Sequence, residues 1–108
     1  MKRGDIVTVA APGDYGKPRP AVVIQSDWLA KTDSVIVALM TSATFDAPIY
    51  RLDVEASPET GLKARTPVMV EKLLAVPREK CGGKIGRLDA TTLSALNRKL
   101  SVVIGLAD

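Results

Sequence analysis

The chain has 108 residues, of which 46% are apolar and 25% charged, and this predicts one soluble domain, residues 1–108, around one hydrophobic core. One cysteine and no histidine exclude an internal disulfide, a Cys/His zinc site and a Cys–His nucleophilic pair. The net charge of +3 is compatible with a polyanionic ligand, but an aromatic content of 4% disfavours nucleic-acid binding mainly by base stacking.

Short β-branched or alternating runs, separated by clusters of turn-forming residues, predict five or six strands. The expected strands are Asp5–Ala10, Pro20–Gln25, Ser34–Met40, Ile49–Val54, Pro67–Val76 and a short strand around Ile85. Two of these runs are continuously apolar, as expected for strands that are covered on both faces. A short helical turn over Ser26–Ala30, with Ser26 or Asp27 as its cap, joins these two runs.

The last segment has the pattern of an amphipathic helix. Asp89 is a good N-cap and Gly105 a suitable stop. The apolar positions recur at helical spacing: Leu93, Leu96, Leu100, Val103 and Ile104. Because only one face is apolar, we expect this helix to pack across an open end of the sheet rather than to bind a partner or a membrane surface.

No leader with a cleavage site and no apolar stretch of membrane-spanning length is present, so we expect a cytoplasmic protein with no membrane partner. Cys81 lies between Lys80 and Gly82, and a cationic neighbour can activate a thiol. A small residue that fills space before a turn is the simpler interpretation of Cys81.

Arg19 lies between two prolines, directly before the apolar run that begins at Ala21. Each proline fixes its own backbone and favours extended geometry in the residue before it, so the guanidinium is held as a pre-oriented set of donors for a phosphate. Thr41 and Ser42 place two hydroxyls at the end of another buried run. Together they would make a compact phosphate site; alone, they also fit a stiff turn and a strand terminator.

The order of motifs resembles the MazF/PemK family of bacterial toxins over nearly the whole chain. The motifs are, in order, Arg3-Gly4-Asp5-Ile6-Val7, Arg19-Pro20-Ala21-Val22-Val23, Thr41-Ser42, Gly61-Leu62 and a closing helix. The resemblance implies a mainly β fold, a small SH3-like barrel of five to seven strands with a C-terminal α-helix. It also implies a homodimer, a cognate antitoxin, and an endoribonuclease that cleaves single-stranded RNA sequence-specifically, without metal or cofactor, and so inhibits translation and growth.

RNA supplies its own nucleophile, the 2′-hydroxyl, so cleavage to a 2′,3′-cyclic phosphate and a 5′-hydroxyl needs neither a metal nor a protein nucleophile. Arg19 is suited to stabilise the charge on the crowded phosphate, and Thr41 to hold a non-bridging oxygen or to orient Arg19. Asp14 occupies the place where relatives often carry a glutamate, and it is either the base that takes the 2′-proton or a turn residue beside Gly13. Lys17 and Ser42 are expected to contact the RNA.

One departure from the family concerns the strand after residue 66, where PemK-type relatives carry an arginine and an aspartate. Those places hold Leu74 and Pro77 here, and Arg78 with Glu79 follows as a candidate substitute. The Glu71-Lys72 pair is expected to form an exposed ion pair or to face the RNA groove.

Two other functions fit the same fold. A gyrase poison, which is not an enzyme, would use an apolar surface near Ile104–Asp108 but would leave Arg19 and Thr41 without a purpose. An SH3-like module would bind RNA without cutting it. Incubation with RNA in EDTA, together with a gyrase assay, distinguishes the three functions.

Overall fold

The structure is a computed structural model, and it describes residues 1–10, 17–43 and 46–108. Its strands and helices are β1 (Asp5–Val9), β2 (Arg19–Val23), η1 (Asp27–Leu29), β3 (Ser34–Met40), β4 (Arg51–Val54), β5 (Thr66–Pro77), η2 (Arg78–Lys80), β6 (Cys81–Arg87) and α1 (Ala90–Val103). The mainly β prediction, with a single C-terminal α-helix, is therefore confirmed.

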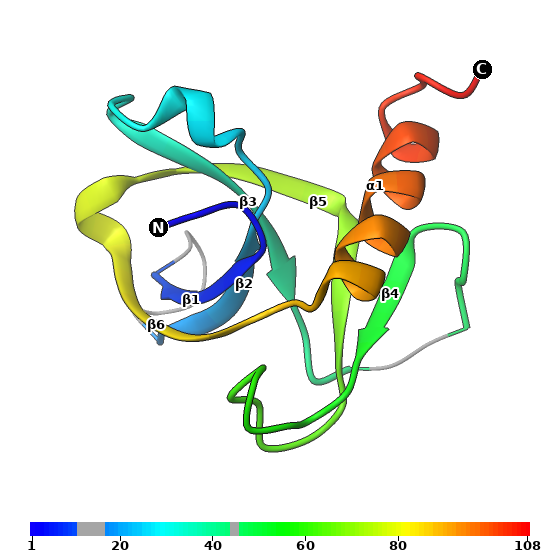
Figure 1. Cartoon of the computed structure of the whole chain (residues 1–108), viewed down its shortest axis with the longest axis horizontal. Helices are drawn as coiled ribbons and strands as arrows, with labels where there is room; N and C mark the ends of the chain where they lie inside the picture. Colours follow the sequence, from blue (N-terminus) through cyan, green and yellow to red (C-terminus); the bar gives the residue numbers. More distant parts are fainter. Residues whose placement is uncertain (11–16, 44–45) are drawn as a thin grey trace.

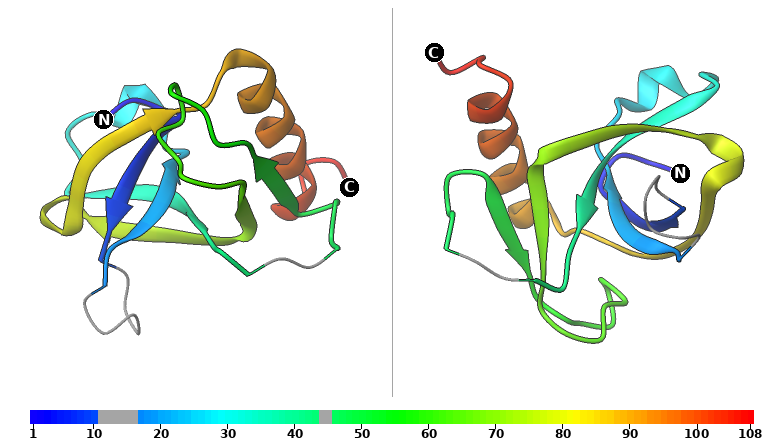
Figure 2. Two further views of the ribbon diagram at one scale, coloured as in Figure 1. Left: turned by 90° about the horizontal axis from the view of Figure 1, so that it is seen from below. Right: turned by 180° about the vertical axis from the view of Figure 1, so that it is seen from behind.

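All six strands belong to one antiparallel sheet in the order β4-β5-β3-β2-β1-β6. The sheet curls, so that β5, the short helix η2 and β6 wrap around β1 and β2 (Figure 1). Helix α1 lies beside β4 and β5, and the views from below and behind show it outside the curled part of the sheet (Figure 2). This is the barrel-like architecture that the sequence predicts, with a strand number within the expected range.

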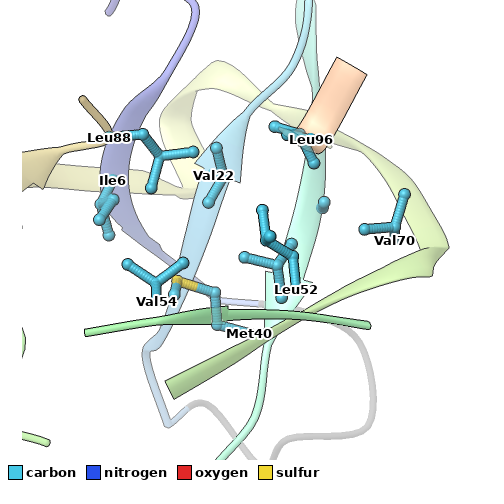
Figure 3. Close-up of a cluster of buried hydrophobic side chains, with 10 residues drawn as sticks. Ile6, Val22, Met40, Leu52, Val54, Val70, Leu88 and Leu96 are labelled. Atoms are coloured by element: carbon cyan, nitrogen blue, oxygen red, sulfur yellow. The ribbon is translucent and has the colours of Figure 1, made fainter. Parts of the chain in front are cut away.

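Alternation along the strands sends successive side chains to opposite faces, and each face carries its own apolar cluster. The first cluster, between the sheet and α1, includes Ile6, Val22, Met40, Val70 and Leu96 (Figure 3). The second cluster lies on the other face. It consists of Val7, Val9, Ala21, Val23, Val35, Val37 and Val76. The prediction that β2 and β3 are covered on both faces is confirmed for Ala21–Val23 and for most of β3, but Ile36 is 40% exposed.

Strand β5 is long because it pairs with two neighbours. Its first half pairs with β4, where Met69 lies opposite Arg51, and its second half pairs with β3, where Leu73 lies opposite Ala38. The register with β3 shifts between Ala38 and Met40, which places a bulge in β5 before Leu73.

Helix α1 begins where the sequence predicts. The Asp89 carboxylate accepts the Thr92 N–H at 2.7 Å, and Gly105, at φ +82°, follows the helix end. Leu96 is fully buried, whereas Ile104 is 55% exposed, so the apolar face is shorter than its sequence pattern indicates. Among the described residues, no helix is long and apolar enough to cross a membrane.

Two elements refine the sequence prediction. The short helical turn is η1, and Ser26 caps it by accepting the Trp28 N–H at 3.2 Å. Strand β6 runs from Cys81 to Arg87 and is therefore longer than the short strand predicted around Ile85. Glycine at position 82 permits close approach to β1, because an added Cβ there would lie 2.2 Å from Thr8 Oγ1.

The 57–61 turn crosses the end of β6. The Arg87 N–H donates to the Glu59 carbonyl at 3.0 Å, and a Cβ at Gly86 would lie 2.0 Å from the Thr60 carbonyl oxygen. Gly61, at φ +70°, is equally close to the Ile85 carbonyl. The two backbones can touch only because glycine is present on both sides.

We expect Gly86→Ala to lower the free energy of unfolding by about 2–3 kcal/mol, because the added methyl group overlaps backbone that cannot move freely. Gly83→Ala is the matched control, since nothing lies within 4 Å of a Cβ at that position of the same strand. Urea unfolding of both variants measures the difference. Equal stabilities would show that the 57–61 turn is not tightly packed on β6.

Candidate active site

The candidate site begins at the first residue of β2. Arg19 is solvent-exposed and pairs in register with Val9 of β1. Pro18 and Pro20 flank it, so its backbone is extended and stiff. The structure thus places the guanidinium at the mouth of a strand whose following residues, Ala21 to Val23, are buried.

Thr41 lies across the sheet from Arg19. Ala21 pairs with Leu39, and each step back along β2 is one step forward along β3, so Arg19 faces Thr41 when this register is continued. The Thr41 N–H donates to the Pro67 carbonyl at 3.0 Å, which holds this end of β3 against β5. The Thr41 hydroxyl accepts the Ala43 N–H at 3.1 Å and keeps its own hydrogen for donation.

Ser42 and Lys17 extend the polar surface on either side of this pair. Both residues are exposed, Ser42 directly after Thr41 and Lys17 two residues before Arg19. Asp14 lies outside the described residues, so its expected role stays a prediction. Within the part of the chain that the structure describes, no three acidic or cysteine side chains are grouped so that they could hold a metal ion.

Side-chain alternation places a second pair on the same face of the sheet as Arg19 and Thr41. Val22, Met40, Leu52, Val68 and Val70 all point into the first cluster. The residues between them in each strand therefore point to the opposite face. We call this surface the Arg19 face, and its members are Arg19, Thr41, Arg51, Asp53, Met69 and Glu71.

Arg51 and Glu71 form a forked ion pair on the Arg19 face. The Arg51 Nη2 lies 2.7 Å from Glu71 Oε2, and Nε lies 2.9 and 3.1 Å from the two carboxylate oxygens. The Arg51 side chain is only 9% exposed and that of Glu71 27%. Partial burial raises the pKa of Glu71, but the hydrogen bonds and charge of Arg51 outweigh it and hold that pKa below its ordinary value.

Of the two alternatives for Glu71 and Lys72, the ion pair is wrong, because the partner of Glu71 is Arg51 on the neighbouring strand. The alternative that these residues face an RNA groove stays a prediction. Sequence reasoning missed Arg51 because the two residues are 20 positions apart and meet only through the register of β4 with β5. The alternation of Arg51 with Leu52 was the available signal, since it showed that Arg51 would point away from the core.

The structure also separates Arg78 from the candidate site. The Arg78 guanidinium donates to the carbonyl of Thr32 and, at 3.3 Å, to that of Leu29, both before the start of β3. Thr41 follows the other end of β3, about 23 Å along the strand. Arg78 thus contacts the loop before β3, and whether it or Glu79 substitutes for the pair of PemK-type relatives stays a prediction. Leu74 packs against the second apolar cluster.

Cys81 is a space-filling residue, as the simpler interpretation holds. Its side chain packs against the second cluster, and Sγ lies 3.7 Å from the Pro77 carbonyl oxygen. Burial raises the pKa of the Cys81 thiol, although the charge of Arg78 opposes this. A raised pKa lowers the thiolate fraction, which makes this thiol a poor nucleophile at neutral pH.

The Arg51–Glu71 pair predicts a specific pH dependence of stability. Because the pKa of Glu71 is lower in the folded state, the pair stabilises the fold above the ordinary carboxyl value of 4.5, and this contribution is lost as the pH falls through the folded-state pKa. We expect Glu71→Gln to flatten this part of the pH profile. Thermal unfolding between pH 7 and pH 3 measures it, with the exposed Glu59→Gln as control. Parallel profiles for wild type and Glu71→Gln would contradict the pairing.

Comparison with known proteins gives a consistent result. The family model described as "PemK-like, MazF-like toxin of type II toxin-antitoxin system" matches residues 2–104. The chain is also 43% identical, over 108 residues, to the "Probable endoribonuclease MazF" of Mycolicibacterium smegmatis, and the match covers 99% of both chains.

Solved structures share the fold at low sequence identity. The Mycobacterium tuberculosis toxin MazF-mt6 is 20% identical, with a TM-score of 0.81 over 94% of this chain and 96% of that one. An endoribonuclease in complex with its cognate antitoxin, from a mycobacterial species, is 18% identical, with a TM-score of 0.80 over 98% of this chain and 96% of that one. A MazE-MazF structure from Deinococcus radiodurans is 18% identical, with a TM-score of 0.77 over 97% of this chain and 95% of that one.

Proposed function

Because this chain belongs to the PemK-like, MazF-like toxins of type II toxin–antitoxin systems, we propose that it is an endoribonuclease that cuts single-stranded RNA at Arg19 and Thr41. The observation that supports the proposal is that Arg19 begins β2 and Thr41 directly follows β3, two strands that pair antiparallel, so these two residues lie at adjoining strand ends. We further propose that residues 1–108 form one toxin domain that acts in the cytoplasm, where cleavage of mRNA inhibits translation and growth.

The proposed reaction is attack of the 2′-oxygen on the adjacent phosphorus, with departure of the 5′-oxygen. Arg19 neutralises the charge that accumulates on the phosphate oxygens, and its stiff backbone reduces the reorganisation this requires. The Thr41 O–H donates to a non-bridging oxygen, because its acceptor side is already engaged by Ala43. The bond from phosphorus to the 5′-oxygen breaks, and a cyclic phosphate and a 5′-hydroxyl result.

Proton transfer is assigned to Asp14 on the family resemblance. The carboxylate takes the proton of the 2′-hydroxyl, and the leaving 5′-oxygen is protonated by water. Lys17 and Ser42 contact neighbouring phosphates, which fits their exposure beside the reacting pair. No step requires a metal ion or another cofactor.

The structural relatives described as bound to a cognate antitoxin or to MazE support the proposal of an antitoxin partner. A homodimer is proposed on an apolar groove beside the end of α1, which is lined by Leu29, Ile36, Leu73, Ile104 and Leu106, among others. Four of these residues are well exposed, from 40% at Ile36 to 76% at Leu106. We propose that two chains associate through this groove, which we call the helix-end groove.

A gyrase poison is the weaker alternative. The exposed end of α1 offers the apolar surface that such a function would need, and Ile104 and Leu106 are its most exposed apolar residues. That function gives no role to Arg19 or Thr41. The placement of these two residues therefore favours the nuclease.

We expect Arg19→Ala to lower the rate of RNA cleavage by about 10²–10³-fold, because a donor to the developing charge is lost. The assay follows a single-stranded RNA in EDTA and identifies the cyclic phosphate end. Arg98→Ala is the matched control, since Arg98 is an exposed arginine on α1 whose guanidinium donates to Ser94 Oγ, one turn earlier on the same helix. Normal cleavage by folded Arg19→Ala protein, or a strict need for added magnesium, would refute the proposed mechanism.

The dimer is tested by a charge placed in the helix-end groove. We expect Ile36→Asp to convert a dimer into a monomer, because a carboxylate would be buried without a partner. Ile49→Asp is the control, at a position that is 68% exposed and lies outside the groove. Sedimentation analysis measures both variants. A monomeric wild-type chain, or a dimer that persists in the Ile36→Asp variant, would exclude this interface.

A further inference from the structure

The Arg51–Glu71 pair has no role in the proposed cleavage. It nevertheless lies on the Arg19 face, together with the residues proposed to cleave the RNA. Pro67 of β5 contacts Thr41 through its carbonyl, and Glu71 follows Pro67 by four residues on the same strand. The two positions are thus about 13 Å apart along β5. An RNA strand held at Arg19 and Thr41 that continued along β5 would bring a neighbouring nucleotide to Glu71.

A carboxylate on a surface that binds a polyanion reduces affinity unless it is neutralised and makes a specific contact. Arg51 supplies the neutralisation, since its fork contacts both oxygens of Glu71. With a side-chain exposure of 9%, the guanidinium is too buried to serve as a general phosphate contact. Its observed contacts instead fix the direction of the carboxylate of Glu71.

Glu71 retains the capacity to accept another hydrogen bond. A carboxylate has about four acceptor positions, and among the hydrogen bonds between described residues Arg51 fills three of them, with one contact to Oε1 and two to Oε2. The side chain is 27% exposed, so a ligand can reach it. Glu71 also lies in the part of β5, between Val68 and Leu73, where the register with β3 shifts, and such irregularities are frequent near binding sites.

The same contacts argue against proton transfer by Glu71. The Arg51 charge holds the pKa of Glu71 below its ordinary value, which makes the carboxylate a weaker base than a free one. A carboxylate acceptor whose direction is fixed by Arg51 is instead suited to read hydrogen-bond donors. On nucleic-acid bases, such donors include the exocyclic amino groups.

We propose that Glu71, positioned by Arg51, reads the exocyclic amino group of a base that flanks the cleaved bond. This inference rests on the proposed endoribonuclease function. It makes Glu71 a specificity-determining residue and Arg51 a positioning residue. A base that presents a carbonyl oxygen at the same place is rejected, because two acceptors would face each other.

The first experiment compares cleavage preferences on an RNA pool with randomised positions. We expect wild-type protein to prefer an amino-bearing base at one position by about tenfold, and Glu71→Gln, which offers both a donor and an acceptor, to lose that preference. Arg51→Lys keeps the charge but not the fork, and we expect it to weaken the same preference only. Glu59→Gln, which removes the carboxylate of the exposed ion pair with Arg87, is the control and should match wild type.

The second experiment changes the RNA in place of the protein. A substrate in which the base at that position lacks its amino group should be cut by wild-type protein about tenfold more slowly, and at an unchanged rate by Glu71→Gln. This cycle isolates the contact even where the substitution alters stability. Unchanged preference in Glu71→Gln, or equal loss of cleavage on every sequence, would overturn the proposal while the nuclease function stands. If wild-type protein cuts no RNA, both fall.

Discussion

The register of β5 is the constraint on which the rest of the structure depends. Its first half pairs with β4 and its second half with β3, and the bulge before Leu73 allows one strand to serve both neighbours. The change of partner brings β4 beside the curled part of the sheet and gives α1 a surface on which to pack. It also brings Arg51 next to Glu71, on the face that carries Arg19 and Thr41. Core and candidate site thus result from one pairing pattern.

Along β2, β4 and β5, alternation places polar residues of the candidate site between residues of the core beneath α1. On β2, Val22 points into the cluster beneath α1, while Arg19 and Ala21 point the other way. The same alternation on β5 buries Val70 and turns Glu71 outward. Polar side chains can therefore gather on one surface while the residues between them remain fully buried. Site and core share backbone without sharing side chains.

Local features of the chain were sufficient to predict most of the fold. The run Ser34–Met40 is almost uniformly apolar and rich in β-branched residues, and its strand has the predicted bounds. The cap at Asp89 and the periodic leucines fixed α1. The pairing of Arg51 with Glu71 could not be predicted in the same way, because it requires the register between strands 20 residues apart. The contacts of Arg78 with Thr32 and Leu29 join residues that are 46 and 49 positions apart, so a local sequence pattern cannot predict them.

The close contact between the 57–61 turn and β6 has a consequence for how the molecule meets its neighbours. β6 is the last strand of the sheet, and an outer strand offers unpaired backbone groups to any other chain. The turn occupies those groups near Gly86, and the Arg87 N–H is already bonded to Glu59. Strand addition at the Gly86–Arg87 end of β6 is thereby blocked. Other chains then bind through side-chain contacts, which can distinguish one partner from another better than backbone pairing can.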